Sequence, residues 1–367
     1  MGRFAVIAGG GTAGHVHPGL AVARALVDRG HDASSILYVG SEHGIERELV
    51  PAAGFELMTV PGRGIPRQLS FGAVKAGASL IRGVGVGLRL LGRERPAVVL
   101  SLGGFAAIPC AIGARIRRIP VVIHEQNAVP GAANRLIGRW ARAAAVSFPN
   151  TPLPHAVLTG NPVRTEMLAV DRQTQRADAR ARLGVEPGRG LVVVTGGSLG
   201  ALRLNEAALD AAEHWAERDD ICLRHIIGER DWDILAPRRA SLGGALQYQA
   251  VRYEADMPAV FAAADVVLSR AGASTTSEIA IVGVPSVLIP LPGAPGDHQT
   301  ANAQALVDVG AARLIRDVDF GGGEMASMVD ELLSDPVILD TMGHAARSVG
   351  RPDAAEQVAI LLEEHAA

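Results

Sequence analysis

Short runs of apolar, β-branched residues alternate along this chain with longer stretches in which apolar positions recur every three to four residues. An apolar run bounded by turn residues predicts a buried strand, and the periodic stretches predict amphipathic helices. Strands that alternate with helices are typical of βαβ units and therefore of parallel sheets. The predicted strands are 4–8, 36–40, 97–101, 121–124 and 144–148 in the first half, and 191–195, 223–227, 247–251, 265–268 and 286–290 in the second.

The predicted strands form two similar sets, and a glycine-rich turn follows the first strand of each set, at 9–14 and at 196–200. The sequence therefore predicts an α/β fold with two tandem Rossmann-like domains, residues 1–163 and 164–345, whose parallel sheets face each other across a cleft. Ligands of such sheets bind beyond the carboxyl ends of the strands. We expect residues 346–367 to form a helix that packs back toward the first domain.

The composition agrees with two domains in a reducing compartment. With 367 residues, 48% of them hydrophobic, the chain is long enough for two cores. Its two cysteines, Cys110 and Cys222, lie far apart and form neither a disulfide framework nor a zinc pattern, which favours the cytoplasm. The N-terminal residues indicate a first strand and not a signal peptide, because no basic leader precedes the apolar run.

The charge is distributed unevenly between the two halves. Residues 1–163 carry a net charge of +9 and residues 164–367 a net charge of −12, within a total of −3. A basic half of this kind is expected to meet an anionic partner. Segment 71–95 is the strongest candidate for that contact, since its basic residues recur every seven positions among apolar ones, as in helices that bind anionic lipid surfaces. An ordinary surface helix is the alternative. The candidate membrane residues are Phe71, Lys75, Leu80, Arg82, Leu88 and Arg89.

The turn at 9–14 is the first candidate site. A strand that breaks into glycines and then enters a helix leaves backbone N–H groups free to bind a phosphate. His15 follows directly, where it can accept a proton. The spacing of Gly9, Gly11 and Gly14 also fits a dinucleotide-binding fingerprint, but the acidic residue that should follow the second strand is missing at the expected place. A metal site is disfavoured, because His15, His17 and His124 lack the spacing of a ligand set.

Three further clusters of polar residues follow predicted strands. His124-Glu125-Gln126-Asn127 ends one strand, and we expect these side chains to bind the hydroxyls of a sugar, since as packing residues each would need a buried partner. In the second half, residues 269–278 supply hydroxyls at a helix start, a second phosphate site in which Glu278 can accept from ribose hydroxyls. Helix capping by Ser274 or Thr275 is compatible with that role. Residues 296–302 offer polar side chains for a second sugar.

Taken together, these segments resemble the MurG family, the bacterial enzymes that transfer N-acetylglucosamine from UDP-N-acetylglucosamine to undecaprenyl-pyrophosphoryl-N-acetylmuramoyl-pentapeptide. The resemblance spans about residues 4–345 in order and with compatible spacing. It implies the GT-B architecture, inversion at the anomeric carbon and no required metal or other cofactor. It rests on Gly-Gly-Thr-Ala-Gly-His-Val-His-Pro at 10–18, His-Glu-Gln-Asn at 124–127, Gly-Asn-Pro-Val-Arg at 160–164, Gly-Gly-Ser-x-Gly at 196–200, Gly-Ala-x-Thr-x-Ser-Glu at 272–278 and His-Gln-x-x-Asn at 298–302.

Carried over by position, the resemblance implies two sets of binding residues. It places the uracil near Tyr253 and Met257, the ribose on Glu278, and the sugar hydroxyls on Gln299 and Asn302. The implied acceptor site comprises Gly11, Thr12, Ala13, Gly14, Gly104 and Asn127. The implied donor site comprises Thr12, Gly14, Asn127, Arg164, Gly197, Ser198, Tyr253, Met257, Gly272, Ser274, Thr275, Glu278, His298, Gln299 and Asn302.

The implied reaction is a single displacement in which the 4-hydroxyl of the acceptor sugar attacks the anomeric carbon, converting lipid I to lipid II for peptidoglycan. His15 is the first candidate for the base and Glu125 the second. The resemblance also implies a peripheral position on the cytoplasmic face of the bacterial membrane, with no nucleic-acid partner. The alternatives are a GT-B enzyme that glycosylates a diacylglycerol, a UDP-sugar epimerase, and, from other classes, a nicotinamide dehydrogenase or a nucleotide-sensing regulator.

Overall fold

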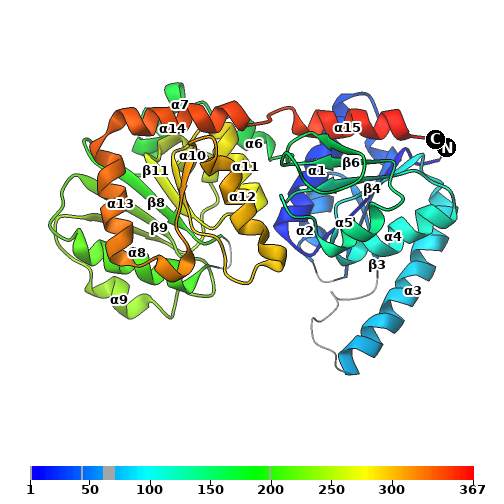
Figure 1. Cartoon of the computed structure of the whole chain (residues 1–367), viewed down its shortest axis with the longest axis horizontal. Helices are drawn as coiled ribbons and strands as arrows, with labels where there is room; N and C mark the ends of the chain where they lie inside the picture. Colours follow the sequence, from blue (N-terminus) through cyan, green and yellow to red (C-terminus); the bar gives the residue numbers. More distant parts are fainter. Residues whose placement is uncertain (1, 43, 61–70, 198–199) are drawn as a thin grey trace. The chain divides into compact units, whose positions relative to one another are not determined.

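The computed structural model of the chain describes residues 2–42, 44–60, 71–197 and 200–367, without the side chains of 71–81 and 105. The chain divides into two compact units (Figure 1). Unit 1 contains residues 1–164 and 351–367, and unit 2 contains residues 165–350. The backbone therefore passes between the units twice, after Arg164 and after Gly350.

Unit 1 is built on a seven-stranded sheet in the order β3-β2-β1-β4-β5-β6-β7, and every pair of neighbours is parallel. The reversal of strand order beside β1 is the one found in Rossmann folds. The strands are β1 (Ala5–Ala8), β2 (Ile36–Ser41), β3 (Glu56–Val60), β4 (Val98–Ser101), β5 (Val121–Glu125), β6 (Ala143–Val146) and β7 (Ala156–Leu158). The helices are α1 (Ala13–Asp28), α2 (Glu46–Ala52), α3 (Phe71–Glu94), α4 (Gly104–Ile116), α5 (Ala132–Ile137) and α15 (Ala354–His365), with a short 3-10 helix at Ala33–Ser35.

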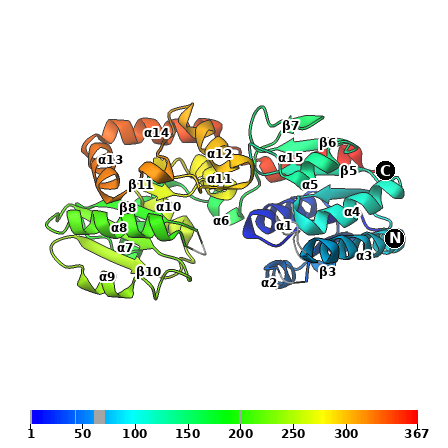
Figure 2. The ribbon, with the colours of Figure 1, turned by 60° about the horizontal axis from the view of Figure 1, so that its bottom comes forward.

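Helices cover both faces of this sheet because successive strand residues point to opposite sides. Ile7 of β1 packs in the cluster that contains residues of α1 and α15, whereas its neighbour Val6 packs in the cluster that contains residues of α3, α4 and α5. Figure 1 shows α15 lying beside α1, and Figure 2 shows α3 beside α4. Strands buried on both faces need continuous apolar runs, and such runs are what predicts β1, β4 and β5 in the sequence.

Helix α15 closes one face of unit 1, although unit 2 precedes it in the sequence. Val358 and Leu362 are fully buried in the core cluster on that face. Glu363 forms an ion pair with Arg29 at 2.7 Å and a hydrogen bond with His31 at 3.0 Å. The segment 351–367 is therefore a structural part of unit 1.

Unit 2 has a six-stranded parallel sheet in the order β10-β9-β8-β11-β12-β13. Helices α8 and α13 contribute to the core cluster on one face of this sheet. The strands are β8 (Gly190–Thr195), β9 (Ile221–Ile226), β10 (Gln247–Val251), β11 (Val266–Ser269), β12 (Ser286–Leu288) and β13 (Ala312–Leu314). The helices are α6 (Thr165–Leu168), α7 (Arg172–Arg182), α8 (Leu202–His214), α9 (Ala236–Ser241), α10 (Met257–Ala263), α11 (Ala273–Val282), α12 (His298–Val307), α13 (Gly322–Ser334) and α14 (Pro336–Val349), with 3-10 helices at Pro295–Asp297 and Asp317–Asp319.

The predicted fold class, α/β with two parallel sheets, is confirmed. All ten predicted strands are present within a few residues, and the structure adds β3, β7 and β13. Over the described residues, no helix combines the length and apolar character that crossing a bilayer requires.

Candidate active site

The glycine turn of unit 1 lies where the strand order reverses, between β1 and β4. Loops at this point of an open parallel sheet form its ligand site. The chain leaves β1 at Ala8, passes through the turn and enters α1 at Ala13. Gly11 has φ +89°, a left-handed conformation that favours glycine. The turn therefore has the position and the backbone geometry that the sequence predicted for an anion-binding loop.

One amide of this turn is already bonded to a carboxylate that the sequence analysis missed. The Gly11 N–H donates to both carboxylate oxygens of Glu46, at 3.2 and 3.0 Å. Glu46 is fully buried and also accepts from the N–H and the hydroxyl of Ser41, each at 2.7 Å. Burial raises the pKa of this carboxyl, but the donors from Gly11 and Ser41 outweigh burial and hold the pKa below its ordinary value. In this structure the Gly11 N–H is therefore bonded to Glu46, while binding of the acceptor by this loop stays a prediction.

The amides at the start of α1 remain available. In the described part of the chain, the backbone N–H groups of Ala13 and Gly14 have no acceptor, as is normal for the first turn of a helix. Thr12 is the N-cap residue, but its side chain does not cap the helix. Instead, the hydroxyl of Thr12 lies 3.0 Å from Nδ1 of His15. The anion-binding capacity of the loop therefore lies at Ala13 and Gly14.

His15 lies in the first turn of α1, half-buried, with its ring oriented by Thr12. Burial lowers the pKa of His15, and the negative charges of Glu125 and Glu46 offset part of that effect. The net shift is downward, so the imidazole is neutral at pH 7 and can accept a proton. Gly104 lies close by, since a Cβ placed on it would stand 3.9 Å from Cε1 of His15. The structure thus brings together His15, Thr12 and Gly104, as predicted.

Glu125, the second candidate for the base, is enclosed by donors. Its Oε1 accepts from the Asn127 N–H at 3.0 Å and from the Asn127 side chain at 3.4 Å. Its Oε2 accepts from the Gly131 N–H at 2.9 Å and from Nδ2 of Asn134 at 3.0 Å. The residue is buried, with 2% of its surface exposed. With these four donors around it, the carboxylate ties together the loop that follows β5.

Two other side chains of this polar run differ from the expectation that they bind sugar hydroxyls. His124 is fully buried, with Nε2 3.3 Å from the Gly160 carbonyl oxygen and Nδ1 3.0 Å from the Gln126 amide nitrogen. Gln126 also donates to the Leu102 carbonyl oxygen at 3.2 Å. Burial lowers the pKa of His124 to about 4. Both side chains therefore have buried hydrogen-bond partners, which the sequence alone does not show. Through these bonds they connect the end of β5 to neighbouring loops.

Asn134 is a further residue that the sequence analysis missed. It lies in α5, is buried, and donates to the His124 carbonyl oxygen at 3.1 Å as well as to Glu125. A single asparagine in a short helix carries no sequence signal of such a role. For Glu46 the structure shows why Gly40 and Gly44 are glycines, since a Cβ on either would overlap the Glu46 side chain, but these glycines alone do not point to Glu46 in the sequence.

In unit 2 the corresponding turn follows β8. Gly197 has φ +87°, and its N–H donates to the Thr195 hydroxyl at 3.2 Å. Ser198, a predicted donor-binding residue, lies outside the described residues. Beneath the turn, Asn205 donates to the Asp231 carboxylate at 2.9 Å. A buried carboxylate therefore lies behind this turn as well.

The loop between β11 and α11 offers a second helix start at the point where strand order reverses. Gly272 is the N-cap of α11 and makes no side-chain cap. The hydroxyl oxygen of Ser274 is buried and has no hydrogen-bond partner. Such an atom indicates a group that a ligand can satisfy. Thr275 and Glu278 follow within the next turn and are half-buried.

Gln299 and Asn302 of α12 hold the same loop. Oε1 of Gln299 accepts from the N–H groups of Ala271 at 3.1 Å and Leu291 at 3.0 Å. Asn302 is fully buried and donates to the Ala271 carbonyl oxygen at 3.1 Å. Asn302 therefore supports the loop from beneath, which differs from the expected direct contact with sugar hydroxyls. His298 begins α12 and contacts the Pro295 carbonyl oxygen through Nδ1 at 2.9 Å.

The remaining predicted donor residues lie at element ends. Tyr253 follows β10 and is 65% exposed, so its ring is accessible to a planar ligand. Met257 begins α10, which Asp256 caps by accepting the Ala259 N–H at 3.1 Å. Arg164 is the final residue of the first segment of unit 1 and is half-buried.

Both units match models of a known protein family. Residues 5–146 match the N-terminal domain of glycosyltransferase family 28, and residues 191–358 match its C-terminal domain. A protein of Clavibacter sepedonicus is 40% identical over 360 residues, covering 98% of this chain and 95% of the relative. It is named UDP-N-acetylglucosamine--N-acetylmuramyl-(pentapeptide) pyrophosphoryl-undecaprenol N-acetylglucosamine transferase.

The chain belongs to the MurG family of glycosyltransferases. Among solved structures, MurG of Acinetobacter baumannii superposes with a TM-score of 0.78 at 28% identity, covering 99% of each chain. UDP-GlcNAc 2-epimerase of Neisseria meningitidis superposes with a TM-score of 0.68 at 13% identity, over 99% of this chain and 100% of the epimerase. That second likeness shows the shared fold alone. The predicted family is confirmed, and the epimerase alternative is not favoured.

Proposed function

We propose that this glycosyltransferase moves N-acetylglucosamine from UDP-N-acetylglucosamine to the 4-hydroxyl of the N-acetylmuramoyl-pentapeptide carried on undecaprenyl pyrophosphate. The similarity to a named transferase across 98% of the chain carries this proposal. The alternatives of a dehydrogenase and of a nucleotide sensor lack such support.

His15 is the base in the proposed reaction. It takes the proton from the acceptor hydroxyl while that oxygen bonds to the anomeric carbon and the bond to UDP breaks, with inversion. The lowered pKa of His15 supports this role, because the ring is unprotonated at neutral pH. The 3.0 Å contact between Nδ1 and Thr12 leaves Nε2 as the nitrogen for the substrate. The donors around Glu125 support a positioning role for that carboxylate.

Unit 1 binds the acceptor and unit 2 binds the donor in this proposal. The N–H groups of Ala13 and Gly14, with Gly11, Thr12, Gly104 and Asn127 around them, bind the acceptor pyrophosphate and sugar. The start of α11 binds the donor diphosphate, supported by the unpartnered Ser274 hydroxyl. Helix N-termini of this kind stabilise the charge that develops on the leaving UDP, and the proposed reaction needs no bound metal.

We further propose that the protein works as a peripheral enzyme on the cytoplasmic face of the bacterial membrane, through α3. Arg82 and Arg89 are exposed on this helix, seven residues apart, and Leu88 is half-buried beside them. The side chains of Phe71, Lys75 and Leu80, also predicted to contact lipid, lie outside the described residues. Basic residues on an exposed helix face are attracted to anionic headgroups.

The decisive experiment incubates the purified chain with labelled UDP-N-acetylglucosamine and a lipid I analogue and follows label into lipid. The expected product is a lipid-linked disaccharide with inverted configuration, and His15→Ala should abolish its formation at unchanged donor affinity. A diacylglycerol acceptor and a no-acceptor reaction run in parallel. Label in a diacylglycerol, or epimerised UDP-sugar without lipid product, would reject the proposal.

A further inference from the structure

A pocket whose lining includes four arginines, a histidine and a tryptophan, beside apolar residues, opens on unit 1 away from the glycine turn. Its volume is about 610 Å³, within the range of roughly 300–1,000 Å³ typical of small-molecule sites. The lining side chains come from the last turn of α4, the segment that leads from α4 into β5, the segment before β6 and the residue before β7. The polar and aromatic residues that line it are Arg115, Arg118, Arg139, Trp140, Arg142 and His155.

This pocket lies at the amino ends of the strands of unit 1, whereas the candidate active site lies at their carboxyl ends. Val121, which lines the pocket, is the first residue of β5, whereas Glu125 ends the same strand. Arg142 directly precedes β6, and His155 directly precedes β7. In a parallel sheet the amino ends of the strands lie on the same side, about 13 Å from the carboxyl end of a five-residue strand. A ligand here is therefore distinct from the proposed substrates.

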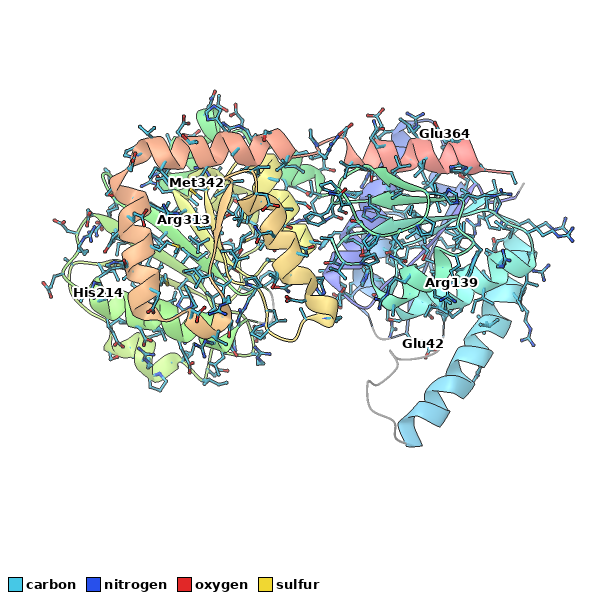
Figure 3. The ribbon with its side chains drawn as sticks, viewed as in Figure 1. Glu42, Arg139, His214, Arg313, Met342 and Glu364 are labelled. Atoms are coloured by element: carbon cyan, nitrogen blue, oxygen red, sulfur yellow. The ribbon has the colours of Figure 1, made fainter. Side chains whose placement is uncertain are left out.

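The four arginines of the pocket are exposed side chains. No carboxylate lines the pocket, and in the described part of the chain none of these guanidinium groups forms an ion pair. Arg117, their sequence neighbour, instead donates to the Leu88 carbonyl oxygen at 2.8 Å and points elsewhere. The dipole at the end of α4 accounts for Arg115 in the last helical turn. It does not account for Arg139 and Arg142, which come from the segment after α5. Figure 3 labels Arg139 on this unit.

Trp140, one of the lining residues, carries a hydrogen-bond donor that has no partner. Its indole Nε1 is buried and has no hydrogen-bond partner. The Arg115 guanidinium carbon lies 5.7 Å from the centre of the Trp140 rings. Buried indole N–H groups normally find an acceptor, so an unpaired one beside four arginines favours a ligand that is rich in oxygen atoms.

Two residues of the lining also hold a strained backbone. Arg118 has φ +60° and His155 has φ +53°, a region that side chains other than glycine rarely adopt. Five non-glycine residues of the described chain have such a φ, and two of them line this one pocket. At Arg118 the positive φ belongs to the turn that ends α4, in which the Ile119 N–H donates to the Ala114 carbonyl oxygen at 2.9 Å. This turn fixes the direction in which the chain carries Arg118 past the helix end.

We propose that this pocket, lined by Arg115, Arg118, Arg139, Trp140 and Arg142, is a second ligand site that binds a phosphorylated polyanion. Guanidinium groups bind phosphate oxygens through paired N–H donors, and the orphan indole N–H supplies one more. The shared chemistry is a phosphate group, which a soluble phosphorylated metabolite or the headgroup of an anionic lipid can provide.

The test uses the full chain and inorganic pyrophosphate as the probe. Trp140 is the only tryptophan of unit 1, since Trp215 and Trp232 belong to unit 2. Binding should change its fluorescence, and Trp140→Phe should remove that signal while calorimetry still records binding. The double variant Arg118→Ala/Arg142→Ala should raise the Kd at least tenfold. The matched control Arg24→Ala/Arg47→Ala loses the same charge from exposed sites elsewhere on unit 1 and should change the Kd less than twofold.

A second arm distinguishes the source of the phosphate. Vesicles of phosphatidylglycerol are compared with vesicles of phosphatidylcholine by co-sedimentation. Loss of phosphatidylglycerol binding in the pocket variant, without pyrophosphate binding in the wild type, supports a lipid headgroup as the ligand. Loss of pyrophosphate binding supports a soluble ligand. Equal losses in the pocket and control variants, or no binding in either arm, overturn the proposal, and lipid II synthesis in the transfer assay is scored independently.

Discussion

Glu46 accepts the backbone N–H of Gly11 with both of its carboxylate oxygens, at 3.2 and 3.0 Å. The same side chain bonds to Ser41, so it links the turn after β1 to the end of β2. A residue outside the glycine motif therefore holds the loop that carries the proposed base.

Replacing Glu46 by glutamine should slow transfer while the protein stays folded. A glutamine presents one NH₂ group to donors that need an acceptor, and a charged hydrogen bond contributes about 1.5–3 kcal/mol. We expect kcat to fall about tenfold or more. Because the Glu46 charge raises the pKa of His15, its removal should also move the acidic limb of the rate profile to lower pH. Glu48→Gln, an exposed change two residues along α2, is the control and should leave both unchanged.

The rate of transfer should fall on the acid side through titration of His15. Burial lowers the pKa of this ring, so the limb should have its midpoint below the ordinary value of about 6.5. Above that midpoint the ring is neutral and active, and below it the ring is protonated and cannot accept a proton. His15→Gln should lower kcat by about 10²–10⁴ and abolish the limb. A retained limb in this variant assigns the titration to another group.

Glu125→Gln should act mainly on stability. Four donors surround the carboxylate, and the variant leaves at least one of them facing an NH₂ group in a buried site. We expect a loss of about 2–3 kcal/mol in the free energy of unfolding, measured by urea denaturation. Asn134→Ala should show a coupled loss in a double-mutant cycle, since it donates to Oε2 at 3.0 Å. Unchanged urea stability together with lost turnover would instead make Glu125 the base.

Mild acid should destabilise both units through buried neutral histidines. Burial lowers the pKa of His124 to about 4 and that of His225 to about 3. Between those values and the ordinary value of about 6.5, the unfolded chain binds protons that the folded chain does not, so stability falls as pH drops. The slope of unfolding free energy against pH from 6.5 to 4 should decrease in His225→Asn and in His124→Asn. A slope identical to wild type in both variants assigns acid sensitivity elsewhere.

The sequence predicted the central strands and missed three at the edges. β3, β7 and β13 end their sheets, and β7 is exposed along its whole length, so it lacks the apolar run that marks a strand buried on both faces. The strand β10 is also at an edge. Its five residues include Tyr248, Ala250 and Val251, and these apolar and aromatic residues are enough to predict a strand.

At the site, local pattern located His15 and the glycine turn but not the partners of those groups. Glu46 contacts Gly11 across 35 positions, and His124 contacts Gly160 across 36. The spacing of apolar residues indicates burial and secondary structure. It carries no information on which distant loop supplies the hydrogen-bond partner of a polar side chain. The polar run at 124–127 was therefore interpreted as facing a sugar, although the structure turns His124 and Gln126 toward backbone carbonyls.

The return of α15 to unit 1 has a consequence for synthesis of the chain on the ribosome. Residues 165–350 emerge as one continuous segment, so unit 2 has all of its sequence before Val358 and Leu362 leave the exit tunnel. Until then, the face of the first sheet that receives α15 stays open to solvent and to chaperones. Completion of unit 1, whose first segment is made before unit 2, thus waits for a segment that is translated after unit 2.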